Sequence, residues 1–340
     1  MAKINYRKLI SFGKGSYIIS MPKSWVEKNN LKKGDLINVL EGSAELILSP
    51  NSLEAAEEPL EITIEVENKS LDLLRAEIVS AYLNNYNTIE IMGKSLDQHI
   101  LKIKEIVRNL TGLEIKEQTS TRLVARDLIN INDISIQNII RRMDMITRSM
   151  IDDVILCLDK KCNYQSIEHR DVDVNRLYYL GFRTVKNAMS NPMVAKKLGM
   201  DMWRLHSDKM VMLRIEEIAD RQKRISNLIS EAELRDKALE EFKKIKEGLR
   251  QRYHEVMKSY YTNDKKIAYN TEITNKEFIE MCDKFFEDAS KKLAAELKKG
   301  SGEPGIPRNK DILPVAKMVE HTKAATTFIK YIARTVLNMD

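Results

Sequence analysis

The 340-residue sequence contains few of the residues that interrupt regular structure. It has 7 Pro and 12 Gly, and aromatic residues make up 6% of it. Because Gly and Pro mark most turns and aromatic residues are enriched in strands, their scarcity favours long helices over an aromatic-rich β-sandwich. Hydrophobic residues still reach 43% and charged residues 31%, which excludes a disordered chain. A chain of this length is expected to form two or three domains.

Cysteines and long apolar runs are also scarce. The three cysteines, Cys157, Cys162 and Cys282, show no metal-site spacing, and their odd number fits a reducing compartment better than a disulfide framework. No stretch approaches the roughly 18 apolar residues of a membrane span, and no hydrophobic signal-peptide segment follows the first ten residues. We therefore expect a cytoplasmic protein without membrane insertion.

Sequence signatures of catalysis are missing as well. The five histidines are scattered and form no HExxH motif, and no serine or cysteine lies in a nucleophile-elbow or catalytic-loop sequence. The sequence therefore gives no support for an enzyme, and we expect none.

The formal net charge of +6 is unevenly distributed. Residues 1–33 contain eight Lys or Arg and one acidic residue, Glu27, whereas residues 51–131 contain nine Lys or Arg and fourteen Asp or Glu. A focused basic segment indicates a site for an acidic partner, although chance clustering on a solvated surface is an equal alternative.

The basic segment has the pattern of a small β unit. Strands are expected at 7–12, 16–21, 36–40 and 45–48, with a Gly13–Gly15 turn and a short helix over 23–30 that begins after Pro22. Because so short a segment cannot bury a stable core alone, we expect two chains to interleave into a dimer.

This segment also resembles a known family. The run RKLISFGKGSYIISMPKSWVEKNNLKKGDLINV, residues 7–39, is similar to the SpoVT/AbrB (MazE-like) domain. The resemblance implies that residues 1–50 form a swapped-hairpin β domain that dimerises and binds duplex DNA. By the same resemblance, the DNA-facing residues are Arg7, Lys8, Lys14, Lys23 and Lys28. The alternative is a dimerisation module whose lysines only keep it soluble.

A linker at 51–59 and a small α/β connector domain at 60–131 follow. Leu60, Ile62, Ile64 and Val66 alternate with polar residues, which predicts a strand with one solvated face. Further strands and helical stripes give the order βαβαββ, an open sheet with two helices on one face. No Gly-rich phosphate loop is present, which favours a structural spacer; the alternative is a connector or ligand-sensing role that the sequence does not assign.

Residues 132–340 are helical almost throughout. Six long helices are expected near 135–155, 171–190, 203–230, 232–261, 275–299 and 313–338. Short breaks at 190–192, 262–264 and 300–307 separate them. Because three antiparallel helices can bury their apolar stripes together, we expect two three-helix bundles placed end to end, at 135–230 and 231–340.

This region resembles the PhoU domain in two stretches, RDVDVNRLY at 170–178 and EEIAD at 216–220. The resemblance implies a divalent or ferric metal ion held by the i,i+4 pairs Asp171 with Asn175 and Glu216 with Asp220. Asn175 is a neutral and weaker ligand, so the alternatives are a solvated acidic face or a cation such as Arg183 beside it. With or without metal, we expect this face to dock a partner.

Together these features predict a mixed multidomain fold and a dimeric, DNA-binding transcriptional regulator. By resemblance to archaeal PhoU-like regulators, it controls phosphate uptake genes and its helical part senses or relays phosphate status. Two alternatives stay open: an adaptor that binds a phosphate transporter or signalling protein without specific DNA binding, or a regulator that responds to another oxyanion.

Overall fold

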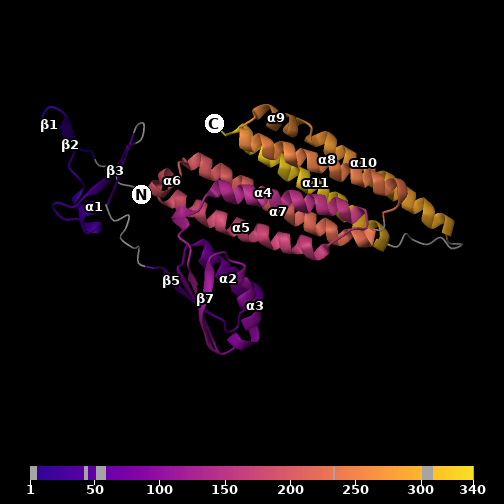
Figure 1. Ribbon diagram of the computed structural model, residues 1–340, viewed down its shortest axis with the longest axis horizontal. Coiled ribbons are helices and arrows are strands. Elements are labelled where there is room, and N and C mark those ends of the chain that lie inside the picture. The colour runs from indigo at the N-terminus through magenta and orange to yellow at the C-terminus, as the bar shows by residue number, and fades with distance from the viewer. Residues whose placement is uncertain (1–5, 42–44, 51–58, 233, 301–308, 340) are drawn as a thin grey trace. The chain divides into compact units, whose positions relative to one another are not determined.

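The computed structural model describes residues 6–41, 45–50, 59–232, 234–300 and 309–339. The chain forms two compact units, Met1–Pro59 and Leu60–Asp340 (Figure 1). The predicted linker at 51–59 and the predicted break at 300–307 lie almost wholly outside the described residues. The helical part and the small N-terminal β unit confirm the expected mixed architecture.

The described residues of the N-terminal unit form two antiparallel hairpins and one short helix. Strands β1 (Ile10–Phe12) and β2 (Ser16–Ile18) pair with Ser11 opposite Tyr17. Helix α1 (Lys23–Lys28) follows, and β3 (Ile37–Glu41) pairs with β4 (Leu46–Pro50). Gly13 lies in the first hairpin turn with φ of 69°, a backbone conformation that glycine adopts without steric cost.

The second unit begins with an α/β module whose element order is the predicted βαβαββ. Its elements are β5 (Glu61–Glu65), α2 (Leu71–Leu83), β6 (Thr88–Met92), α3 (Leu96–Arg108), β7 (Leu113–Gln118) and β8 (Arg122–Asp127). The sheet order is β5-β6-β8-β7, with β5 parallel to β6 and the other pairs antiparallel. Apolar strand residues such as Ile64, Ile91 and Leu123 share a buried core with α2 and α3.

In the described part of the second unit, eight α-helices follow the α/β module and form what we call the helical body. They are α4 (Ile136–Leu158), α5 (Tyr164–Ser190), α6 (Pro192–Lys197), α7 (Met202–Ala232), α8 (Asp236–Thr262), α9 (Lys265–Ile273), α10 (Asn275–Gly300) and α11 (Asn309–Leu337). The six long helices correspond to the six predicted ones. Helix α5 starts seven residues earlier than predicted, because the Asn163 side chain accepts a hydrogen bond from the Ser166 N–H and caps it there.

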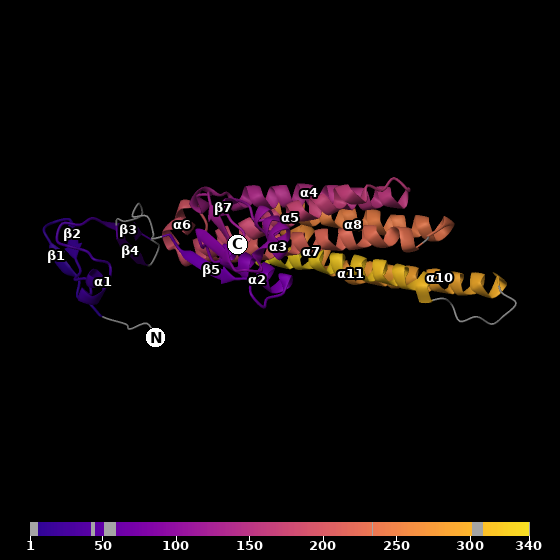
Figure 2. The same cartoon turned by 90° about the horizontal axis from the view of Figure 1, so that it is seen from below.

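The prediction of two bundles placed end to end is wrong. The long helices run side by side (Figures 1 and 2), and α7 packs along α11. Buried residues of all six, from Ile136 in α4 to Val336 in α11, belong to one continuous hydrophobic core. The apolar stripes of the two halves therefore bury each other, which removes more apolar surface from water than two separate bundles would.

Two predicted breaks each contain the start of a short helix. Asn191 caps α6, and Pro192 occupies its first turn, where a missing N–H costs nothing. Asp264 accepts hydrogen bonds from the N–H groups of Lys266 and Ile267 and caps α9, directly after Asn263 ends α8 with φ of 50°. The breaks were predicted correctly, but the capping residues within them also begin new helices.

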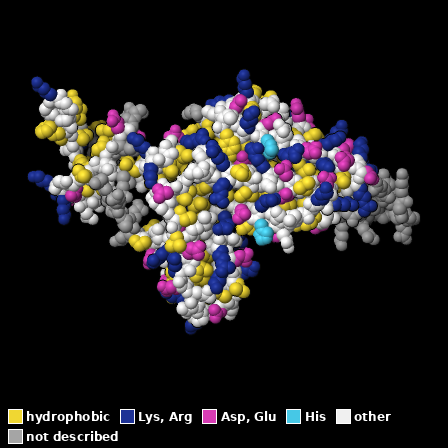
Figure 3. Space-filling view, viewed as in Figure 1, with side chains coloured by type: hydrophobic (Ala, Val, Ile, Leu, Met, Phe, Trp, Pro, Cys, Tyr) yellow, Lys and Arg dark blue, Asp and Glu magenta, His cyan; other side chains and the backbone are white. Residues whose placement is uncertain are grey.

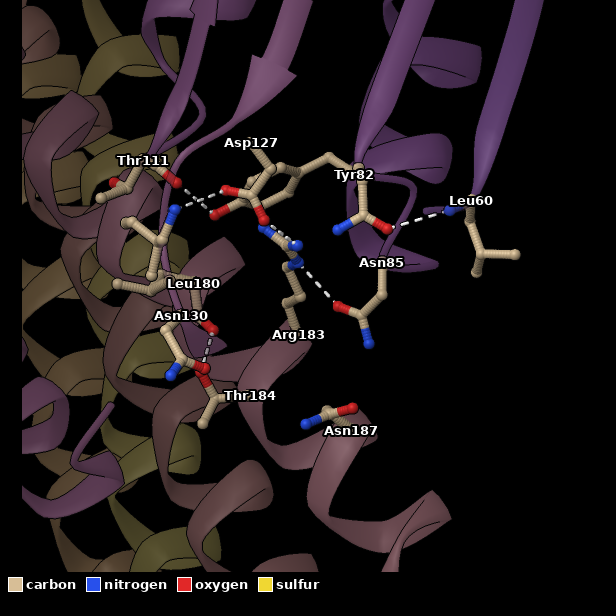
Figure 4. A network of polar contacts seen from close by, with 12 residues as sticks. Leu60, Tyr82, Asn85, Thr111, Asp127, Asn130, Leu180, Arg183, Thr184 and Asn187 are labelled. Atoms are coloured by element: carbon tan, nitrogen blue, oxygen red, sulfur yellow. Dashed lines mark hydrogen bonds and ion pairs between the residues drawn. The ribbon is translucent and has the colours of Figure 1, made fainter. Parts of the chain in front are cut away.

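A buried polar network joins the α/β module to α5 (Figure 4). The Arg183 guanidinium forms an ion pair with Asp127, and both side chains are 2% exposed. Its Nε donates to Asn85 Oδ1 at 2.7 Å, and the guanidinium lies 4.6 Å from the Tyr82 ring centre. Burial raises the pKa of Tyr82 to about 12, and its hydroxyl donates to the Thr111 carbonyl at 2.8 Å. The module and the helical body are thus held together by charge as well as by packing.

The cysteine expectation is wrong for two of the three residues. Cys157, at the end of α4, forms a disulfide with Cys162 in the turn before α5, whereas Cys282 is free and buried. Lys160 adopts φ of 61° in this turn and returns the chain toward α4, which brings the two sulfurs together.

None of the helices in the described part of the chain contains a segment that is both long and apolar enough to cross a membrane.

Candidate nucleic-acid interface

The five predicted DNA-facing residues lie on three parts of the N-terminal unit. Arg7 and Lys8 precede β1, Lys14 lies in the β1–β2 turn, and Lys23 and Lys28 lie at the two ends of α1. All five side chains are exposed. The cations therefore come from the segment before β1, from the β1–β2 turn and from α1.

These cations are almost free of internal counterions. Among the described residues, one ion pair involves them, between Lys23 Nζ and Glu27 Oε1 at 3.5 Å, with the side chains 88% and 64% exposed. Because so exposed a pair contributes little and is easily replaced, the five cations are available to an external anion. Figure 3 shows the Lys and Arg side chains of this unit at its upper tip and lower edge, with apolar side chains between them.

The N-terminal unit has no buried residue in its described part. Large apolar side chains are instead exposed, and they include Phe12 at 64%, Tyr17 at 70% and Leu36 at 71%. Monomeric proteins rarely expose so large a share of their apolar side chains in one small unit. A single copy of this unit therefore lacks a core of its own.

The predicted carboxylate site lies in the helical body, where α5 and α7 pack together. Asp171 and Asn175 come from α5, and Glu216 and Asp220 come from α7. The Asn175 amide donates to Asp171 Oδ2 at 3.3 Å. The two stretches that sequence analysis selected separately therefore meet across one helix pair.

Basic side chains occupy this site. Lys223 Nζ lies 2.5 Å from Asp171 Oδ2 and 3.6 Å from Asp220 Oδ1, and Arg224 Nε lies 2.7 Å from Asp220 Oδ2. Arg183, the expected neighbouring cation, pairs with Asp127 instead. Among the described residues, no group of three or more His, Cys, Asp or Glu side chains is arranged to hold a metal ion. The arrangement is that of a lysine-bridged carboxylate cluster.

Glu216 is the exception within the cluster, because no hydrogen bond or ion pair to it is present among the described residues. Burial and the neighbouring Asp220, Glu217 and Asp171 raise the pKa of Glu216 to about 7. A carboxyl group in this environment gains or loses its proton near neutral pH. The prediction of a fully solvated acidic face is therefore incorrect for this residue.

Sequence reasoning missed the residues that neutralise the cluster. Lys223 and Arg224 lie three and four positions after Asp220 on the same helix, and this spacing was a readable signal for ion pairs. Lys246 was also missed. It is fully buried, and its ammonium donates to Gln222 Oε1 at 2.6 Å. The sequence does not show this, because a lysine on an amphipathic helix is expected to face solvent.

Comparison with known families finds a match at the N-terminus. The family model described as antidote-toxin recognition MazE, bacterial antitoxin, matches residues 10–55. The match lies in the N-terminal unit and confirms the MazE-like resemblance there, while the comparisons give no evidence for a PhoU-like part. No curated protein and no solved structure matches the chain. The N-terminal unit is thus similar to a class of domains used in DNA-binding regulators.

Proposed function

We propose that the protein is a DNA-binding transcriptional regulator whose N-terminal unit binds duplex DNA as a dimer. The observation that carries the proposal is the set of five exposed cations, Arg7, Lys8, Lys14, Lys23 and Lys28, within a unit that matches the MazE family model. Lys and Arg side chains bind phosphates and fix the register of a protein on the duplex, and a dimer doubles their number.

The exposed apolar surface of the N-terminal unit supports the dimer. Phe12, Tyr17 and Leu36 are each more than 60% exposed in one copy. A second copy supplies the apolar surface that covers them, because exchange of such hairpins builds one core from two small units.

We further propose that the helical body relays phosphate status and that the regulated genes serve phosphate uptake. Support comes from the resemblance of residues 170–178 and 216–220 to the PhoU domain. The lysine-bridged cluster, Glu216 included, is then a docking face for a signalling partner. Regulation requires that the partner or ligand bind the DNA-competent and DNA-incompetent states with different affinity.

Salt-dependent binding to the protein's own upstream DNA tests the proposal. The full chain and a variant without residues 1–59 are titrated into labelled duplex at 100 and 200 mM salt. We expect tight, salt-sensitive binding by the full chain and its loss in the truncated variant, whose own cores lie in residues 60–340. Binding that survives the truncation with little salt dependence contradicts DNA binding by the N-terminal unit and favours the adaptor alternative.

A further inference from the structure

Strand β5 has an open edge. It pairs with β6 on one side, and no strand in the described chain lies on its other side. The residues that flank β5 show which backbone groups bond to β6: Val66 N donates to the Met92 carbonyl, and Thr88 N donates to the Leu60 carbonyl. Because the register is continuous between them, the even-numbered residues Ile62 and Ile64 also bond to β6. In a parallel ladder alternate residues bond to a given neighbour. The N–H and C=O groups of Glu61, Thr63 and Glu65 therefore face outward.

A groove of about 560 Å³ follows this open edge. Strand β5 forms one wall and α2 the other, and the lining includes Ile62, Ile64, Glu77, Ser80, Ala81 and Tyr86. One wall carries unpaired backbone groups and the floor carries apolar side chains. An extended peptide that adds to a sheet edge beside a helix needs these two features, backbone partners and pockets for alternate side chains.

The charge at the open edge narrows the choice of occupant. Glu61 and Glu65 are exposed, and neither has a cationic partner among the described residues. Thr63 Oγ1 between them donates to Glu90, which is already paired with Arg122. A second β5 strand, paired antiparallel about Thr63, would place Glu61 opposite Glu65 and repel. A strand with Lys or Arg at the positions opposite these glutamates would complement their negative charge.

We propose that the groove between β5 and α2 binds an extended segment of a partner protein, which adds to the sheet as a strand beside β5. The segment has Lys or Arg at alternate positions, opposite Glu61, Thr63 and Glu65. Small apolar side chains lie between them and enter the groove beside Ile62 and Ile64. This docking site is independent of DNA binding by the N-terminal unit.

Two synthetic peptides, acetyl-KVKVK-amide and acetyl-EVEVE-amide, serve as probes for the full chain in isothermal titration calorimetry. We expect binding of the basic peptide and none of the acidic one. Glu61→Lys with Glu65→Lys should reverse this preference. Equal binding of both peptides, or of neither, overturns the proposal.

Thr63→Pro tests the backbone contribution, with Thr63→Ala as the matched control. Proline removes the outward N–H of residue 63 and leaves the hydrogen bonds to β6 intact, so the fold should survive; circular dichroism checks this. We expect Thr63→Pro to weaken binding of the basic peptide about tenfold or more, through lost edge hydrogen bonds, while Thr63→Ala binds as the parent does. Equal affinities for the two variants contradict strand addition. A change of oligomeric state in Thr63→Pro, measured by ultracentrifugation, would instead assign the edge to a second copy and overturn the proposal.

Discussion

Replacement of Arg183 by Met should weaken the attachment of the α/β module to the helical body. The substitution leaves the Asp127 carboxylate, whose side chain is 2% exposed, with the Ile129 N–H at 3.2 Å as its remaining hydrogen-bond donor among the described residues. Removing one partner of a buried ion pair costs about 3–5 kcal/mol, because the other charge stays buried and uncompensated. The cation–π contact with Tyr82 at 4.6 Å and the hydrogen bond to Asn85 are lost as well.

Urea denaturation and native-state hydrogen exchange measure this effect. We expect the unfolding free energy of the second unit to fall by about 3–5 kcal/mol, with faster exchange in α2 and β8 on the module side of the junction. The double variant Arg183→Met with Asp127→Leu removes both charges and should recover most of the loss, because an apolar replacement of a buried pair is often close to neutral. If the double variant is as unstable as the single one, an uncompensated Asp127 is not the source of the loss and the reasoning is refuted.

Three further substitutions test the interior of the helical body. Burial lowers the pKa of Lys246 from 10.5 to about 7, so the folded state binds fewer protons than the unfolded state and stability rises with pH from about 7 to 10.5. Lys246→Met should abolish that rise in denaturation midpoints. An unchanged pH profile of the variant would contradict this reasoning. The pKa of Glu216 is raised from 4.5 to about 7, so its effect on stability is the opposite: the free energy of unfolding falls as pH rises through this window. Glu216→Gln should therefore raise the free energy of unfolding by about 1 kcal/mol at pH 8, after allowance for solvent screening. An equal gain at pH 4 would point to another cause. In Gly181→Ala the new Cβ would clash with Met212 Sδ, and we expect the free energy of unfolding, measured by thermal unfolding, to fall by about 1–3 kcal/mol. Adding Met212→Ala should relieve part of this loss. If the losses of the two substitutions simply add, the clash is contradicted.

Local patterns predicted the elements well, because each depends on nearby residues. The alternation of Leu60 to Val66 gave β5, and the helical stripes gave the six long helices of the body. The side-by-side packing of the two helical halves was not predictable in this way. Every helix carries one apolar stripe, and a stripe does not specify which other helix covers it.

The candidate sites show the same limit. Exposure of the five N-terminal cations follows from their place in a segment too short to bury a core, but neither periodicity nor spacing showed that Arg183 would be buried against Asp127, 56 positions away. The i,i+4 pairs correctly indicated that Asp171 and Asn175, and Glu216 and Asp220, each share a helix face. Only the packing of α5 on α7 shows that Lys223 lies between Asp171 and Asp220 and pairs with both carboxylates.

The most direct test of DNA binding by the N-terminal unit is the slope of log K against log salt concentration for variants of its cations. Each phosphate contact contributes a slope of about −0.9, so Lys14→Gln with Lys23→Gln removes four contacts per dimer and should make the slope less steep by about 3.6. Lys276→Gln is the matched control, because Lys276 is exposed in the helical body and 3.7 Å from Glu280. We expect the parental slope for the control and the reduced slope for the double variant. The same slope for all three proteins would contradict it.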